Sequence, residues 1–87
     1  MLLDAIKEHF DVPCRIFLEA LSRCLPQLSR QEILWRFHFL LGSLYHTGAH
    51  AERLTSLSNG ECDSTNTEEC LKRLIPFLAA GFRTPTP

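Results

Sequence analysis

The sequence predicts an all-α fold, and two observations predict it. Apolar residues recur every three or four positions along most of the chain, and no stretch alternates apolar and polar residues for long enough to form a β-strand. The chain has 87 residues, of which 45% are hydrophobic and 22% charged, as in one small globular domain. We therefore expect residues 1–87 to form a single helical bundle of four main helices and one short one.

The N-terminal part of the chain predicts two consecutive helices. Residues 2–10 form an amphipathic pattern, with one apolar face and charged residues elsewhere. Asp11 suits the N-cap of a second helix, because Pro13 then falls in the first turn, where its missing N–H costs nothing. An apolar stripe follows, and Pro26 ends this second helix.

The third helix has the clearest start signal. Ser29 and Glu32 form an S-x-x-E capping box directly before a strongly apolar run, residues 33–45. Apolar residues cover most sides of this helix and leave only a narrow polar seam. A helix of this kind is buried on most sides, which is more than two neighbouring helices can provide in so small a domain. The pattern therefore predicts a partner.

A short helical turn is expected next. Gly48 is expected to interrupt the third helix, and residues 49–57 suit a short helical segment. Asn59 and Gly60 are residues that close such a segment in left-handed conformation.

The final helix begins at a second capping box, Thr65 with Glu68, and ends within residues 81–83. Pro76 lies inside it and is expected to bend it. Small residues at 79–81 would let another helix approach closely. Together with the broad apolar surface of the third helix, they predict that two helices from each of two chains form a four-helix bundle.

Composition excludes several classes of function. The formal net charge is −1 and the basic residues are scattered, which argues against nucleic-acid binding by this chain alone. No apolar run reaches the roughly 18 residues of a membrane span, and the N-terminus lacks the basic start of a signal peptide, so we expect a cytoplasmic protein without membrane contact. We interpret the four cysteines as buried thiols of a reducing compartment.

No motif predicts catalysis, a metal or a cofactor. His46 and His50 have the H-x-x-x-H spacing of a metal site, but no Glu follows His46 and Gly48 is expected to break the helix between them. The cysteines form no C-x-x-C pair, and no G-x-S-x-G nucleophile elbow is present. We therefore expect no enzyme, no metal site and no cofactor.

Two polar residues inside the apolar run have two interpretations each. His38 lies between two phenylalanines, which suits a hydrogen-bonded core histidine or, as the alternative, contact with a ligand. Arg36 suits a structural ion pair with a neighbouring helix, or an anchor for the acidic head of a bound molecule. The first interpretation is favoured in both cases.

Three segments carry a family resemblance. Residues 32–44, with the sequence EILWRFHFLLGSL, then 53–60, and then 71–83, with LKRLIPFLAAGFR, resemble the C-terminal half of TetR-family transcriptional regulators. The branch most similar includes fatty-acid-responsive repressors. The resemblance implies a non-catalytic regulatory domain that dimerises through its last two long helices, here residues 33–45 and 71–82. It also implies a small hydrophobic or acyl-type effector that shifts the balance between two arrangements of the dimer.

In this family a helix-turn-helix at the N-terminus reads operator DNA. The chain opens partway through what would be the regulatory domain, so we expect a fragment or a relative without the DNA-binding head. Any contact with DNA would then be made only through that missing N-terminal domain.

Two sets of site residues follow. The resemblance and the apolar pattern predict a homodimer interface at Leu34, Phe37, Leu41, Leu44, Tyr45, Leu74, Phe77, Leu78 and Gly81. Polarity and periodicity predict an effector pocket at Phe17, Leu21, Trp35 and His38. The alternative hypothesis is a small helical protein–protein interaction module with no small-molecule site.

Overall fold

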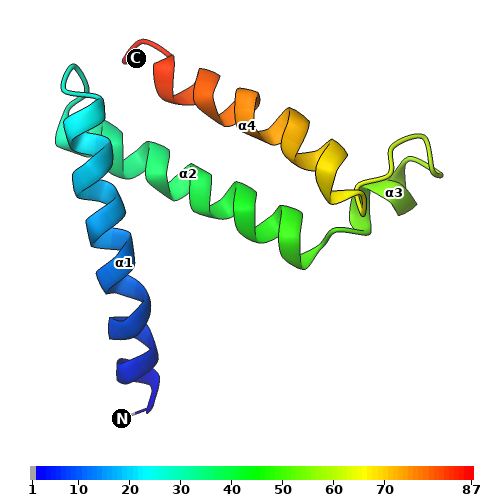
Figure 1. Ribbon diagram of the computed structural model, residues 1–87, viewed down its shortest axis with the longest axis horizontal. Coiled ribbons are helices and arrows are strands. Elements are labelled where there is room, and N and C mark those ends of the chain that lie inside the picture. Colours follow the sequence, from blue (N-terminus) through cyan, green and yellow to red (C-terminus); the bar gives the residue numbers. More distant parts are fainter. Residues whose placement is uncertain (1) are drawn as a thin grey trace. The chain divides into compact units, whose positions relative to one another are not determined.

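All regular structure in the described part of the chain is helical. The computed structural model describes residues 2–87, apart from the side chain of Ile6. Its elements are α1 (Leu2–Cys24), α2 (Arg30–Ala49), α3 (Arg53–Leu57) and α4 (Thr67–Arg83) (Figure 1). The chain divides into two compact units, Met1–Phe37 and His38–Pro87, and α2 passes from one unit to the next. The all-α prediction is confirmed for these residues.

The prediction of two separate N-terminal helices is wrong, because α1 runs unbroken through Pro13. Asp11 lies inside the helix and forms an i,i+4 ion pair with Arg15, with 3.8 Å between Oδ2 and Nη2. Pro13 removes one backbone hydrogen bond and its ring crowds the carbonyl one turn earlier, but the apolar stripe continues in phase across it. Phe10, Cys14, Phe17 and Leu21 follow one another at spacings of four, three and four residues.

The first unit holds the buried hydrophobic residues of the described chain: Leu18, Ile33 and Phe37. The rings of Phe17 and Phe37 pack with 5.7 Å between their centroids. At the start of α2, the Glu32 backbone N–H donates to Ser29 Oγ at 3.2 Å, so the predicted N-cap is confirmed.

Helix α2 continues past the position where a break was expected. Gly48 lies within α2, and the His50 backbone N–H donates to the His46 carbonyl oxygen at 2.9 Å. The break at Gly48 is therefore a wrong prediction, since one glycine costs a helix only about 1 kcal/mol. The short helix α3 follows, and Asn59 (φ 53°) and Gly60 (φ 84°) close it in left-handed conformation as predicted.

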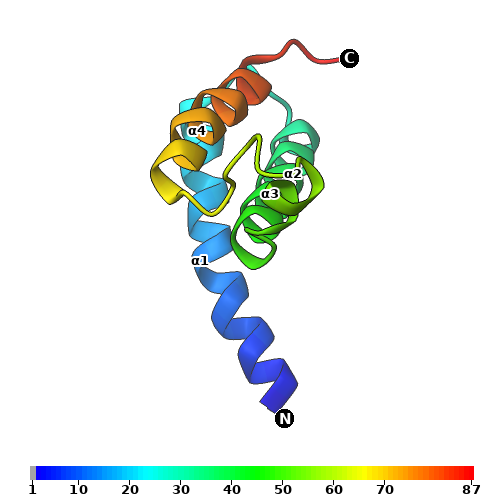
Figure 2. The ribbon, with the colours of Figure 1, turned by 90° about the vertical axis from the view of Figure 1, so that its right-hand side faces the viewer.

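Helix α4 begins one residue later than its predicted capping box. The N-cap is Asn66, whose side-chain oxygen accepts a hydrogen bond from the Glu69 backbone N–H at 3.2 Å. The Thr65 hydroxyl instead donates a hydrogen bond to Asp63 Oδ1. The helix continues through Pro76, and its end at Arg83 agrees with the prediction, whereas the bend at Pro76 stays a prediction. After α4 the last residues leave the helix in extended form (Figure 2).

Two further observations concern the whole described chain. None of the helices within residues 2–87 is both long and apolar enough to cross a membrane. All four cysteines are unbridged, and Cys24 and Cys62 are exposed while Cys14 and Cys70 are half-buried. The interpretation of all four as buried thiols is therefore wrong.

Candidate functional site

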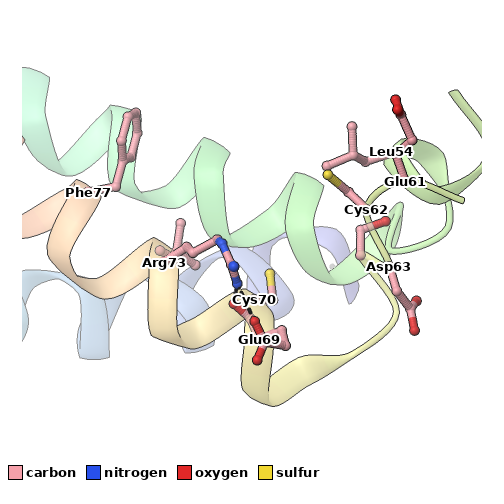
Figure 3. Close-up of a pocket in the computed structure, with 10 residues that line it drawn as sticks. Leu54, Glu61, Cys62, Asp63, Glu69, Cys70, Arg73 and Phe77 are labelled. Carbon is pink, nitrogen blue, oxygen red and sulfur yellow. Dashed lines mark hydrogen bonds and ion pairs between the residues drawn. The ribbon is translucent and has the colours of Figure 1, made fainter. Parts of the chain in front are cut away.

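A groove lies in the second unit between α3, the loop that follows it and the first half of α4 (Figure 3). Its volume is about 490 Å³, which is within the range of small-molecule sites in proteins. Hydrophobic side chains and two thiols dominate the lining, and charged groups stand among them. The lining residues are Leu54, Glu61, Cys62, Asp63, Ser64, Glu69, Cys70, Arg73, Leu74 and Phe77.

Hydrogen bonds to Ser64 hold the loop side of the groove. The Ser64 backbone N–H donates to Thr55 Oγ1 at 2.8 Å, and the Thr55 backbone N–H donates to Ser64 Oγ at 3.0 Å. The Ser64 hydroxyl also donates to the carbonyl oxygen of Ala51. These bonds join positions nine and thirteen residues apart, so they fix the loop against α3 and the turn before it.

One face of α4 forms the opposite side. Cys70, Leu74 and Phe77 are spaced four and three residues apart, which places them on the same helix face. Phe77 is 73% exposed, and Leu54 across the groove is also exposed. In this chain alone the groove therefore presents uncovered apolar surface.

The groove lining contains more negatively charged than positively charged side chains, and its positively charged side chain is paired. Arg73 forms a hydrogen-bonded ion pair with Glu69, and its Nη1 also donates to the Glu69 carbonyl oxygen at 3.0 Å (Figure 3). The hydrogen bond to the Glu69 carboxylate, together with its negative charge, raises the pKa of Arg73. Glu61 and Asp63 add two further carboxylates on the loop side.

Hydrogen bonds from Thr65 favour the charged form of Asp63. The Thr65 hydroxyl and the Thr65 backbone N–H, the latter at 3.1 Å, both donate to Asp63 Oδ1. These hydrogen bonds lower the pKa of Asp63, because they stabilise the charged carboxylate. The groove thus combines apolar walls with three carboxylates and one guanidinium that is already paired.

None of the residues predicted to form the effector pocket lines this groove. Phe17 packs on Phe37, and Leu21 is half-buried on α1. Trp35 is 59% exposed on α2. His38 is also exposed, with its ring centroid 6.0 Å from that of Phe39, so the interpretation of His38 as a core histidine of this chain is wrong.

Arg36 forms a structural ion pair with a residue of its own helix. Its side chain is 8% exposed, and Nη2 lies 3.3 Å from Glu32 Oε1 on the same helix. Nε also donates to Glu32 Oε1 at 3.3 Å. This ion pair is made within α2, at i,i+4 spacing, and the favoured pairing of Arg36 with a neighbouring helix stays a prediction.

The predicted interface residues differ in how much surface they offer. On α2, Leu34, Leu44 and Tyr45 are exposed and Leu41 is half-buried. Phe37 is buried in its own unit and presents little surface to a partner. On α4, Phe77 and Gly81 are exposed, whereas Leu74 and Leu78 are half-buried.

Sequence reasoning missed most of the groove. The spacing of Cys70, Leu74 and Phe77 was a usable signal, because it marks one helix face. The loop residues Glu61 and Cys62 carried no periodic signal, since their loop is positioned by hydrogen bonds of Ser58 and Ser64.

A comparison with protein families decides the identity of the domain. The family model described as "Tetracyclin repressor-like, C-terminal domain" matches residues 2–81, which is most of the chain. The chain belongs to this family. No curated protein and no solved structure matches the chain significantly.

The family assignment confirms the TetR resemblance at the level of the C-terminal domain. The all-α structure is consistent with it. The TetR C-terminal domain is a regulatory domain, and domains of this kind are typically non-enzymatic. The similarity to the fatty-acid-responsive branch stays a prediction.

Proposed function

We propose that this TetR-like domain dimerises and binds a small-molecule effector, and that it thereby controls a transcriptional regulator. The observation that carries the proposal is the family match across residues 2–81. The effector would act by binding one arrangement of the dimer better than another, with a coupling free energy of typically ~1 to 3 kcal/mol. Any effect on DNA would be transmitted to a helix-turn-helix of the parent regulator.

The distribution of burial supports dimerisation. In the described unit His38–Pro87, no hydrophobic side chain is fully buried. Large apolar side chains stand exposed on both long helices of this unit, including Phe39 and Tyr45 on α2 and Ile75 and Phe77 on α4. A stable dimer typically covers about 800 Å² on each partner. A four-helix bundle of α2 and α4 with their counterparts would cover such side chains.

The groove supports an effector with an apolar body. Leu54, Leu74 and Phe77 would contact that body. A free carboxylate on the effector would meet Glu61 and Asp63, while Arg73 is already paired with Glu69. We therefore propose a small hydrophobic effector with a neutral or positively charged head, and an acyl-type effector only where its acid is esterified or lies outside the groove.

The effector pocket predicted at Phe17, Leu21, Trp35 and His38 stays a prediction, in addition to the proposed groove. Leu74 and Phe77 belong both to the groove lining and to the predicted dimer interface. A ligand in the groove would therefore touch side chains that the partner is also expected to touch, which is a direct physical route for coupling the two events.

Ligand binding can be tested with three probes of equal chain length: dodecanol, dodecylamine and dodecanoate. Below their micelle-forming concentrations, we expect dodecanol and dodecylamine to raise the melting temperature of the chain more than dodecanoate does. Leu54→Ala should weaken this effect, whereas the control Leu57→Ala, at an exposed α3 position outside the groove lining, should leave it unchanged. Equal shifts for all three probes, or no difference between the two variants, would contradict the proposed site.

A helical interaction module for a different protein is the second candidate, and the exposed apolar residues of α2 and α4 favour it equally. Self-association of the purified chain, measured together with binding of the three probes, separates the two functions. A monomer that binds none of the three probes would favour the interaction module.

A further inference from the structure

A pair of histidines stands at the C-terminal end of α2, outside the groove lining. His46 lies in the last turn of α2, and His50 follows one turn later. The backbone between them keeps helical spacing, because the His50 N–H donates to the His46 carbonyl oxygen at 2.9 Å. The two imidazole rings are adjacent, with 5.3 Å between their centroids. The Tyr45 ring contacts His50 edge-on, with 6.2 Å between centroids.

We propose that His46 and His50 together bind a divalent transition-metal ion of the Zn²⁺, Ni²⁺ and Cu²⁺ class. The absence of a helix break at Gly48 is what brings the two imidazoles to one side of the chain. Neutral imidazole nitrogen is a preferred ligand of these ions, and i,i+4 spacing on a helix is the spacing at which two imidazoles reach one ion.

The separation of the rings fits chelation. A metal–nitrogen bond of about 2.0–2.1 Å, plus about 1.1 Å from the nitrogen to the ring centre, places each ring centroid about 3.2 Å from the ion. Two ligands at a tetrahedral angle then have centroids about 5.2 Å apart, and ligands at a right angle about 4.5 Å apart. The observed 5.3 Å agrees with the tetrahedral arrangement of Zn²⁺, and the right-angled ligands of Ni²⁺ and Cu²⁺ require the rings to approach to about 4.5 Å. Both side chains are exposed, so their rings can rotate until the two nitrogens converge on the ion.

The position on the helix also favours a cation. The carbonyl end of a helix carries a partial negative charge, and α2 ends at Ala49, between the two histidines. Within the described residues, no group of three or more His, Cys, Asp or Glu side chains is placed to hold a metal. The protein thus supplies two ligands, and water or another ligand of the ion completes the coordination. A site of this kind binds Cu²⁺ more tightly than Ni²⁺, in the usual order of divalent ions.

The test uses the chain without any histidine tag, with its thiols alkylated because thiolates also bind these ions. Isothermal titration with NiCl₂ at neutral pH should show one Ni²⁺ per chain for the wild-type protein. His46→Gln and His50→Gln should each weaken binding by at least about tenfold, since one of two ligands is lost. The matched control is His9→Gln, which removes an exposed histidine of α1. Circular dichroism checks that all three variants keep their helix content.

Paramagnetic broadening gives a second readout. Substoichiometric Ni²⁺ should broaden the imidazole proton resonances of His46 and His50 before those of His9. No Ni²⁺ binding by the wild-type chain up to about 1 mM would overturn the proposal. Unchanged affinity in both His46→Gln and His50→Gln, or equal loss in His9→Gln, would overturn it as well.

Discussion

Replacement of Ile33 by alanine tests whether the small core of the first unit carries the stability of the domain. Ile33 is 1% exposed, the lowest exposure among the large apolar side chains of the described chain. Alanine lacks three of its carbon atoms, worth about 0.8 kcal/mol each in transfer free energy, and the cavity left behind adds to this loss. We expect the free energy of unfolding to fall by about 3 kcal/mol.

That loss is large for a domain of this size, because 0.05–0.15 kcal/mol per residue gives a total stability of only about 4–13 kcal/mol. Urea unfolding followed by circular dichroism measures it, at one fixed protein concentration because a dimer's stability depends on concentration. The matched control is Ile16→Ala on α1, where the side chain is 66% exposed and the expected change is within about 0.5 kcal/mol. The reasoning is refuted if Ile33→Ala costs less than about 1 kcal/mol, or if Ile16→Ala costs as much.

Two further predictions concern the start of α4. Asn66→Ala removes the N-cap and should lower the free energy of unfolding by about 1 kcal/mol in the same assay, and an unchanged value would contradict the assigned cap. Asp63 should titrate below 3.8 in a carboxyl ¹³C NMR experiment, since Thr65 stabilises its charged form. Because the folded-state pKa lies below the unfolded value, the stability that Asp63 contributes is present above 3.8 and is lost as the pH falls through the folded pKa. Thr65→Val should move the midpoint up toward 3.8, and an unmoved midpoint would show that the hydroxyl is not the cause.

A capping pattern predicted a helix start correctly where the sequence offered a single candidate for the N-cap. Ser29 is followed three residues later by Glu32 and then by the apolar run, so its cap could be placed from sequence. The start of α4 was misplaced by one residue, because Thr65 with Glu68 was taken as the cap whereas Asn66, three residues before Glu69, is the N-cap. The hydrogen bond from Thr65 to Asp63 is part of the loop structure and is not visible in the spacing.

Two errors came from giving single residues more weight than the surrounding pattern. Pro13 and Gly48 were both taken as helix boundaries, although neither ends its helix: an interior glycine costs only about 1 kcal/mol, and α1 continues through Pro13 despite the roughly 3 kcal/mol that an interior proline costs. The apolar stripe through Phe10, Cys14 and Phe17 keeps its phase across Pro13, and that phase was the better guide. Because α2 continues past Gly48, the rings of His46 and His50 lie beside each other.

The groove shows where sequence reasoning reaches its limit. Its α4 side follows from helix periodicity, whereas its loop side depends on hydrogen bonds from Ser64 to Thr55 and Ala51. Contacts between positions nine and thirteen residues apart leave no periodic trace in the sequence. The charge pattern of Glu61, Asp63 and Arg73 became readable only once the loop was placed.

The most direct test of the proposed function is the solution mass of the chain, measured by light scattering at several concentrations beside two variants. Tyr45→Glu places a charge at a predicted interface position that is 71% exposed in the single chain, so it should not disturb the fold of the chain itself. Leu57→Glu is the control, at a similarly exposed position outside the predicted interface. We predict a dimer near twice 9.9 kDa for the wild type and for Leu57→Glu, and a folded monomer for Tyr45→Glu. A folded wild-type monomer, or a Tyr45→Glu protein that remains a stable dimer, would contradict the proposed α2–α4 interface.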